Sequence, residues 1–150
     1  MFLKPLLRNP SHPWTLVNGH TGAVLAVRVY AAVDSASRRQ GLLGRTGLDD
    51  EALIIAPCNA VHTFFMRFPI DVVFAARDGR VVKVCLEVRP WRMAGAIRGF
   101  AAIELPAGAA RRHAVAPGDV LRVGVLEPYS PSTRTTTGAD RDAANLPSPR

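Results

Sequence analysis

Turn-forming residue pairs recur at close spacing along this chain and separate short apolar runs that are rich in β-branched residues. Asp78-Gly79 is the strongest of these signals, because the pair suits a type I′ turn between two strands. Asn18-Gly19 predicts a second hairpin, and Pro117-Gly118 predicts a further turn. The pattern indicates about seven or eight short strands and only two short helical segments, so the predicted class is mainly β.

So many strands in about 125 ordered residues need an arrangement that removes exposed strand edges. We therefore expect a small closed or half-open antiparallel barrel or sandwich with one or two short helices. The expected strands cover residues 14–17, 22–33, 53–56, 70–75, 82–88, 100–105 and 120–126. The expected helices cover residues 35–43 and 109–113.

Local signals refine these elements. Asp34 or Ser35 is a suitable N-cap for the first helix, and Gly44 is expected to end it. Period-two alternation directs Val27 toward a core, together with its neighbours two positions away, and places Cys85 on the more polar face of its strand.

The chain divides into three parts by composition. Residues 1–16 are expected to be a loose N-terminal arm, because Pro5, Pro10 and Pro13 interrupt them. Residues 17–127 are expected to form a single β domain, since 150 residues with 48% hydrophobic content suit one core. Residues 128–150 are expected to be a disordered C-terminal tail, because serine, proline, threonine and charged residues there allow no core.

Charge and cysteine content narrow the functional classes. The net charge of +7 comes from 19 basic residues, of which only Lys4 and Lys83 are lysine. These residues form no basic run, so we expect no nucleic-acid partner. No apolar run reaches the length of a signal peptide or a membrane span, and Cys58 and Cys85 are too few for a disulfide framework. We therefore expect a cytoplasmic protein with no membrane partner.

The stretch at residues 58–75 is the candidate functional region. It holds four of the six phenylalanines and places Cys58, His62, Arg67 and Asp71 among them. Cys58 and His62 as metal ligands would need two further ligands, and none stands in a recognised spacing, so we expect no metal and no cofactor. A Cys-His nucleophile pair at this spacing would need a helix, which Pro57 disfavours.

The predicted ligand-binding set combines this stretch with polar residues elsewhere. A pocket for a small polar or anionic ligand would use the residues His62, Thr63, Arg67, Asp71, Arg45, Trp91 and Glu104. Structural alternatives stay open for two of them. Asp71 suits an ion pair with Arg67 or bonds to nearby backbone amides, and Glu104 suits a partner for an arginine.

Four sequence blocks occur in a familiar order: Arg39-Gln40-Gly41-Leu42-Leu43-Gly44-Arg45, Phe64-Phe65-Met66-Arg67 leading to Pro69-Ile70-Asp71-Val72-Val73-Phe74, Ala102-Ile103-Glu104-Leu105-Pro106-Ala107-Gly108, and Pro117-Gly118-Asp119. Together they resemble the bacterial and archaeal domain of unknown function 192 family, over about residues 17–125. The resemblance implies a compact, mainly β domain with short helices, and the family has no established activity.

Two functional hypotheses follow. The first is a non-catalytic binding module for a small polar or anionic ligand or a protein partner, which would use the 62–71 segment and a loop at residues 89–99. The alternative is an enzyme, for example a hydrolase, in which His62 acts as base with Asp71 or Glu104.

Deletion of residues 128–150 should leave the fold intact, because this tail has too few apolar residues to add a strand. Thermal unfolding of the truncated and full-length chains should give the same melting temperature. A loss of several degrees on truncation would contradict the assignment.

Overall fold

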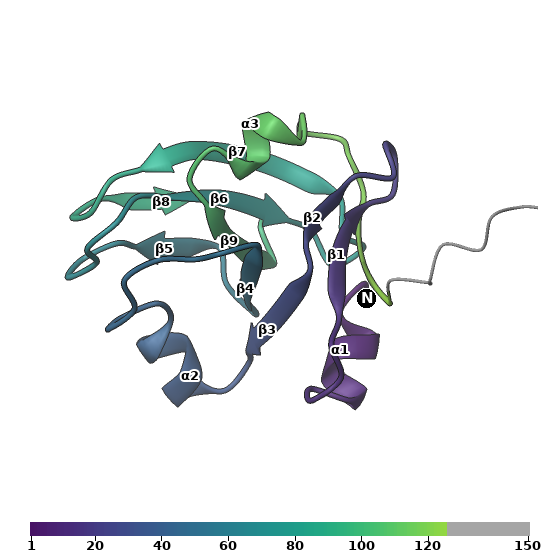
Figure 1. Ribbon diagram of the computed structural model, residues 1–150, viewed down its shortest axis with the longest axis horizontal. Coiled ribbons are helices and arrows are strands. Elements are labelled where there is room, and N and C mark those ends of the chain that lie inside the picture. Colours follow the sequence, from purple (N-terminus) through teal and green to yellow (C-terminus); the bar gives the residue numbers. More distant parts are fainter. Residues whose placement is uncertain (126–150) are drawn as a thin grey trace, which may run out of the picture.

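The structure, a computed structural model, describes residues 1–125 apart from the side chain of Arg39. Those residues form ten strands and three short helices (Figure 1), which confirms the mainly β class. In chain order the elements are α1 (Lys4–Arg8), β1 (Thr15–Asn18), β2 (Val24–Ala26), β3 (Arg28–Ala32), α2 (Ser35–Gln40), β4 (Glu51–Ile55), β5 (Ala60–His62), β6 (Ile70–Ala75), β7 (Val81–Val88), β8 (Met93–Gly95), β9 (Ala101–Pro106), α3 (Ala109–Arg112) and β10 (Leu121–Gly124). The tail predicted at residues 128–150 lies outside the described residues. Within residues 1–125, no helix is long and apolar enough to span a membrane.

A five-stranded sheet with the strand order β3-β4-β9-β6-β7 forms the centre of the molecule. β3 and β4 pair in parallel, and all other neighbours in this sheet are antiparallel. A parallel pair needs a long crossover connection, which here carries α2. Every residue of β6 is buried, because both faces of the sheet are covered.

Two hydrophobic clusters cover the two faces. The first core cluster joins Leu16 and Leu25, from the three-stranded sheet β10-β1-β2, to Ile54 and Ile103 of the five-stranded sheet. The second core cluster packs on the opposite face, under the two-stranded ribbon β5-β8 and the segment after α2. Its members include Leu42, Leu53, Val61, Val72 and Phe74. The sheets do not close, so the fold is a half-open barrel or sandwich and not a closed barrel.

The N-terminal residues differ from the predicted loose arm. Leu3 and Leu6 are each 1% exposed and belong to the first core cluster, on either side of the start of α1. Pro5 lies in the first turn of this helix, where a backbone amide hydrogen has no helical partner, so it does not prevent the helix. The Phe2 amide donates to the Arg77 carbonyl at 3.1 Å, which ties the segment to the body of the domain.

Other predictions needed smaller corrections. Asp34 caps α2 as expected, but the helix ends at Gly41, whose φ of 46° is accessible to glycine, and not at Gly44. Val27 was expected in the core but is 45% exposed, because it lies between β2 and β3 where the chain passes from one sheet to another. The predicted loop at residues 89–99 contains β8, which pairs with β5.

The hairpin predicted at Asp78-Gly79 is confirmed and joins β6 to β7, but the turn is not type I′, because only Gly79 of the pair has a positive φ and the Gly79 amide donates to the Ala76 carbonyl. Gly79 has a φ of 93°, and a Cβ atom there would collide with the Leu121 carbonyl oxygen. Glycine is therefore required at this position by conformation and by space.

A β-bulge interrupts β7 just after Cys85. Ile70 pairs with Val88, but Val72 pairs with Cys85, so Leu86 and Glu87 together lie opposite Asp71. The extra residue shifts the alternation of side chains along β7. Cys85 lies on the same face as Lys83, as the alternation predicts, but this face is not polar: Cys85 is half-buried because the second core cluster covers it.

Asp71 holds this bulge in place. Its carboxylate is fully buried and accepts hydrogen bonds from the Glu87 amide at 2.8 Å and the Ala110 amide at 2.9 Å. One side chain thus joins the bulge of β7 to α3. Of the two structural alternatives considered for Asp71, the structure has the bonds to backbone amides.

Asp71→Ala should lower the free energy of unfolding by about 1–3 kcal/mol, because it leaves two amides at the bulge and α3 without their acceptor. His62→Ala, at an exposed position, should be less destabilising. Urea titration measures both losses, with Asp49→Ala as the control at an exposed aspartate. Equal, large losses for Asp71→Ala and His62→Ala would make His62 a core residue and contradict this assignment.

Candidate functional site

A cleft of about 470 Å³ opens on the side of the second core cluster. Its walls come from α2 and the loop after it, and from the segment that leads into β5, while residues of β4 and β9 also line it. The polar lining residues are Ser35, Arg38, Gln40, Cys58, Asn59, His62 and Glu104. The large apolar lining residues are Leu42, Leu43, Ile55, Val61 and Met66.

Glu104 is the buried acid of this cleft. It lies in the middle of β9, between Leu53 of β4 and Val72 of β6, which both belong to the second core cluster. The residue is only 4% exposed, and its Oε2 atom has no hydrogen-bond partner among the described residues. Burial therefore raises the pKa of the Glu104 carboxyl to about 7, because the charged form loses its hydration.

An acid at this position is unfavourable for the fold. A buried polar atom without a partner destabilises the folded state, and an apolar side chain would fit the surrounding cluster. A titratable group that is buried at this cost and lines a cleft is typical of a functional site. Glu104 is therefore the strongest indication of function in the described part of the chain.

Cys58 lies at the wall of the same cleft as a half-buried, free thiol. Its Sγ donates to the Ala60 carbonyl at 3.0 Å. Burial, and to a smaller extent the Glu104 carboxyl, raises the pKa of the thiol, while the charge of Arg38 opposes the increase. The net result is a protonated thiol at neutral pH, which is a poor nucleophile.

Arg38 supplies a fixed positive charge. Its Nη1 donates to the carbonyls of Val33 and Ala56, and Nη2 lies 3.4 Å from the Ser35 hydroxyl. These contacts hold the guanidinium between the start of α2 and the end of β4. A guanidinium carries five N–H groups, so these contacts leave capacity for a ligand.

An aromatic stack extends outward from His62 at the end of β5. The imidazole Nδ1 accepts from the Phe64 amide at 3.3 Å, and the two ring centroids are 4.8 Å apart. Phe64 in turn stacks on Trp91 at 5.8 Å, and Trp91 contacts Phe65 at 4.7 Å. Trp91 thus adjoins the cleft residue His62 through one ring but does not line the cleft itself.

Three other predicted site residues also lie outside the cleft. Thr63 is buried and structural, because its hydroxyl donates to the Arg89 carbonyl at 2.6 Å and accepts from the Arg92 amide at 2.9 Å. Asp71 faces the first core cluster, where its register partner is Leu105. Arg67 is exposed in the turn before β6.

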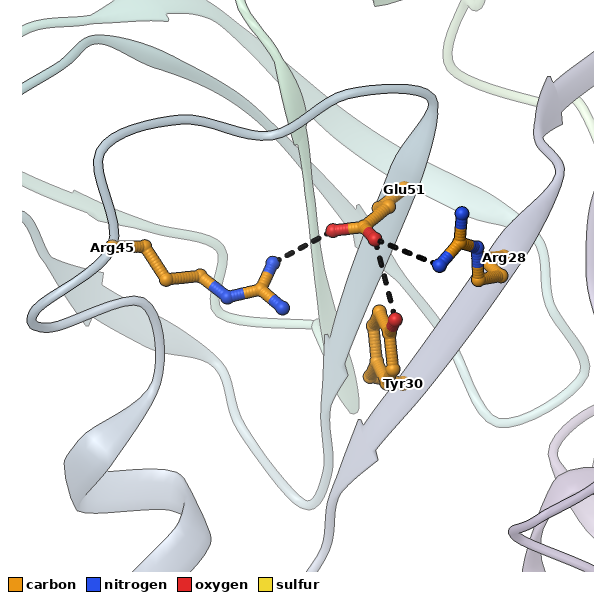
Figure 2. A network of polar contacts seen from close by, with 4 residues as sticks. All are labelled: Arg28, Tyr30, Arg45 and Glu51. Atoms are coloured by element: carbon orange, nitrogen blue, oxygen red, sulfur yellow. Dashed lines mark hydrogen bonds and ion pairs between the residues drawn. The ribbon is translucent and has the colours of Figure 1, made fainter.

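Arg45 belongs to a separate network on the surface of β3 and β4, shown in Figure 2. Its Nη1 pairs with Glu51 at 2.8 Å, and its guanidinium lies 5.3 Å from the centre of the Tyr30 ring. Glu51 also accepts from the Tyr30 hydroxyl at 3.2 Å and pairs with Arg28 at 3.7 Å. The network connects the parallel strands β3 and β4, so Arg45 acts structurally.

The structure therefore brings His62 and Glu104 together in one cleft, and it adds residues that the sequence analysis did not assign to binding. These are Ser35, Arg38, Gln40, Cys58 and Asn59. The sequence signal that could have indicated these residues is the helix α2 capped by Asp34, because it ends within the first of the four sequence blocks that resemble the family. Among residues 1–125, no group of three metal-ligating side chains comes together.

Glu104→Gln should stabilise the protein, and the gain should depend on pH. The unfolded acid ionises near 4.5 and the folded one near 7, so wild-type stability falls as pH rises through this window. The advantage of Glu104→Gln should therefore grow by on the order of 3 kcal/mol between these pH values and then level off. Urea titrations from pH 4.5 to 8 measure it, with the exposed Glu87→Gln as the matched control. A variant that is less stable than wild type at pH 8 would show that Glu104 supports the fold.

Comparison with known proteins gives a family and a fold. A crystal structure of a protein of unknown function from Novosphingobium aromaticivorans superimposes with a TM-score of 0.64 at 27% identity, covering 73% of this chain and 83% of that one. A protein from Sinorhizobium meliloti, described as a proposed transcription regulator, gives a TM-score of 0.65 at 24% identity, with 73% and 91% covered, and shares the fold alone. No curated protein matches the chain. The model of the domain of unknown function 192 family, described as an uncharacterized ACR, matches residues 16–123, and the chain belongs to this family.

Proposed function

We propose that this domain is a non-catalytic binding module that holds a small polar ligand in the cleft. The observation that carries the proposal is Glu104, a buried carboxyl in the cleft whose Oε2 has no hydrogen-bond partner among the described residues. A ligand in the cleft that supplies a hydrogen-bond donor would give this carboxyl a partner.

The composition of the cleft supports binding of a small molecule. Ligand sites are usually concave, mainly apolar, and equipped with a few well-placed polar groups, with volumes of about 300–1,000 Å³. The cleft of about 470 Å³ combines apolar side chains such as Leu42 and Met66 with Arg38, Asn59 and Glu104. Apolar contacts would supply affinity, and the polar groups would set the orientation of the ligand.

The state of the reactive groups favours binding over catalysis. The Cys58 thiol bonds to a backbone carbonyl, and its pKa is raised and not lowered. The His62 Nδ1 already accepts from the Phe64 amide, and no hydrogen bond among the described residues joins this imidazole to Cys58 or Glu104. A nucleophile paired with a base is therefore not assembled.

A second candidate is a hydrolase that uses His62 with Glu104. The observation in its favour is that both side chains line one cleft, and a carboxyl with a pKa of about 7 suits a general acid or base near neutral pH. The two candidates differ in one observable, which is turnover of the bound compound.

We also propose a cytoplasmic location. The support is chemical, since Cys58 and Cys85 are free thiols in the folded domain and suit a reducing compartment.

A thermal-shift screen of the full chain against small polar metabolites should yield compounds that raise the melting temperature, because ligands of the folded state stabilise it. Glu104→Gln should lose most of this shift, while Glu87→Gln, which changes the same group on the surface, should keep it. Hits that stabilise Glu104→Gln as much as wild type would place binding elsewhere. Incubation of each hit with the protein, followed by mass spectrometry, then separates the candidates, since only an enzyme converts the compound.

A further inference from the structure

The cleft is lined by a titratable carboxyl and a guanidinium on different walls. Glu104 belongs to β9 in the middle of the sheet, and Arg38 belongs to α2. Cys58 lines the same cleft, and burial and the carboxyl raise the pKa of its thiol while the guanidinium lowers it. A ligand in the cleft is therefore exposed to a negative and a positive site at once.

Each of the two groups selects the part of the ligand that it binds. The Glu104 carboxyl has an oxygen without a partner and accepts hydrogen bonds when ionised, so it favours a ligand group that donates, and an ammonium group also neutralises the buried carboxylate. Arg38 is held in a fixed orientation by the Val33 and Ala56 carbonyls. A planar guanidinium held in this way is suited to a carboxylate, which can accept two parallel hydrogen bonds.

The lining between these groups is apolar. Leu42, Leu43, Val61 and Met66 contribute side chains to the cleft. An aliphatic group on the ligand would bury its surface against them. A sugar would offer hydrogen-bond donors and acceptors, but it would leave the charges of Glu104 and Arg38 uncompensated. It would also place hydroxyl groups against the apolar side chains.

We infer that the cleft binds a zwitterionic ligand of the amino-acid or short-peptide class, with its ammonium group on Glu104, its carboxylate on Arg38 and an aliphatic side chain against the apolar lining. This inference rests on the proposed binding function and assigns a chemical class to the ligand.

A set of matched probes tests the class. Leucine and the dipeptide glycyl-leucine carry both charges at two separations, whereas leucinamide keeps only the ammonium, N-acetylleucine keeps only the carboxylate, and glucose carries neither. Isothermal titration should show binding of at least one zwitterion, and blocking either of its charges should weaken binding about ten-fold or more. Binding of glucose or of a singly charged probe with equal affinity overturns the inference but leaves the proposed function standing. If no zwitterion binds, the inference is also overturned. The thermal-shift screen described above then tests the proposed binding function separately.

Variants of Arg38 test whether this residue binds the carboxylate of the ligand. Arg38→Gln should weaken the zwitterion about ten-fold or more and leave leucinamide unchanged, because leucinamide has no carboxylate for the guanidinium. Arg112→Gln, which removes an exposed arginine on α3, is the control. Thermal unfolding of Arg38→Gln establishes that the variant is folded, and Arg38→Lys, which keeps the charge, should recover part of the affinity. Equal weakening of leucinamide in Arg38→Gln would contradict the assigned orientation.

The pH dependence of affinity gives an independent readout. The neighbours of Glu104 on the adjacent strands are the apolar Leu53 and Val72, and the other titratable or charged residues of the cleft lining are Arg38, Cys58 and His62. An ammonium on Glu104 requires the ionised carboxyl, so affinity should rise about 20-fold from pH 5.5 to 7.5, given a pKa of about 7. Glu104→Gln should abolish the increase, and His62→Gln should retain it. Affinity that falls as pH rises would mean that the ligand accepts a hydrogen bond from the protonated acid, which overturns the inference.

Discussion

The alternation of side chains along β6 and β9 is the constraint on which the rest of the structure depends. Both strands lie inside the five-stranded sheet, and each sends successive residues into two separate hydrophobic clusters. Asp71 and Glu104 interrupt this apolar pattern on opposite faces. Asp71 is satisfied by two amides and fixes a bulge, whereas Glu104 has an oxygen without a partner and lines the cleft. An acid in the apolar pattern therefore stabilises the fold on one face of the sheet, whereas on the other face it indicates a functional site.

Local features of the fold could be predicted from the sequence, and non-local ones could not. The Asp78-Gly79 hairpin, the Asp34 cap and the strand at β6 depend on neighbouring residues, and all three are confirmed. The parallel pairing of β3 with β4 and the ribbon β5-β8 depend on contacts between distant segments, which periodicity does not report. The N-terminal helix was missed because Pro5 was taken as an interruption, although its place in the first turn is compatible with a helix.

The candidate site was predictable in part for a similar reason. A polar residue among apolar ones can be identified in a sequence, and this identified Glu104 and His62, which share the cleft. Whether such a residue has a partner depends on the tertiary structure. Asp71 receives its amides from residues 16 and 39 positions away, and no local pattern indicates those bonds. Arg38 was missed because an arginine on a short helix resembles a solvated one until β4 is placed beside it.

The pairing of β1 with β10 bears on how the chain reaches this fold. Thr15 lies opposite Gly124, so strands from the two ends of the domain complete the same three-stranded sheet. During synthesis, β1 and the apolar residues of α1 have no partner on one side until β10 has left the ribosome. Contacts of such large sequence separation slow folding, because much of the chain must be ordered before they form. The nascent domain therefore keeps Leu16 and an unpaired strand edge accessible for most of its synthesis, and this is the interval in which association with other chains is most favourable.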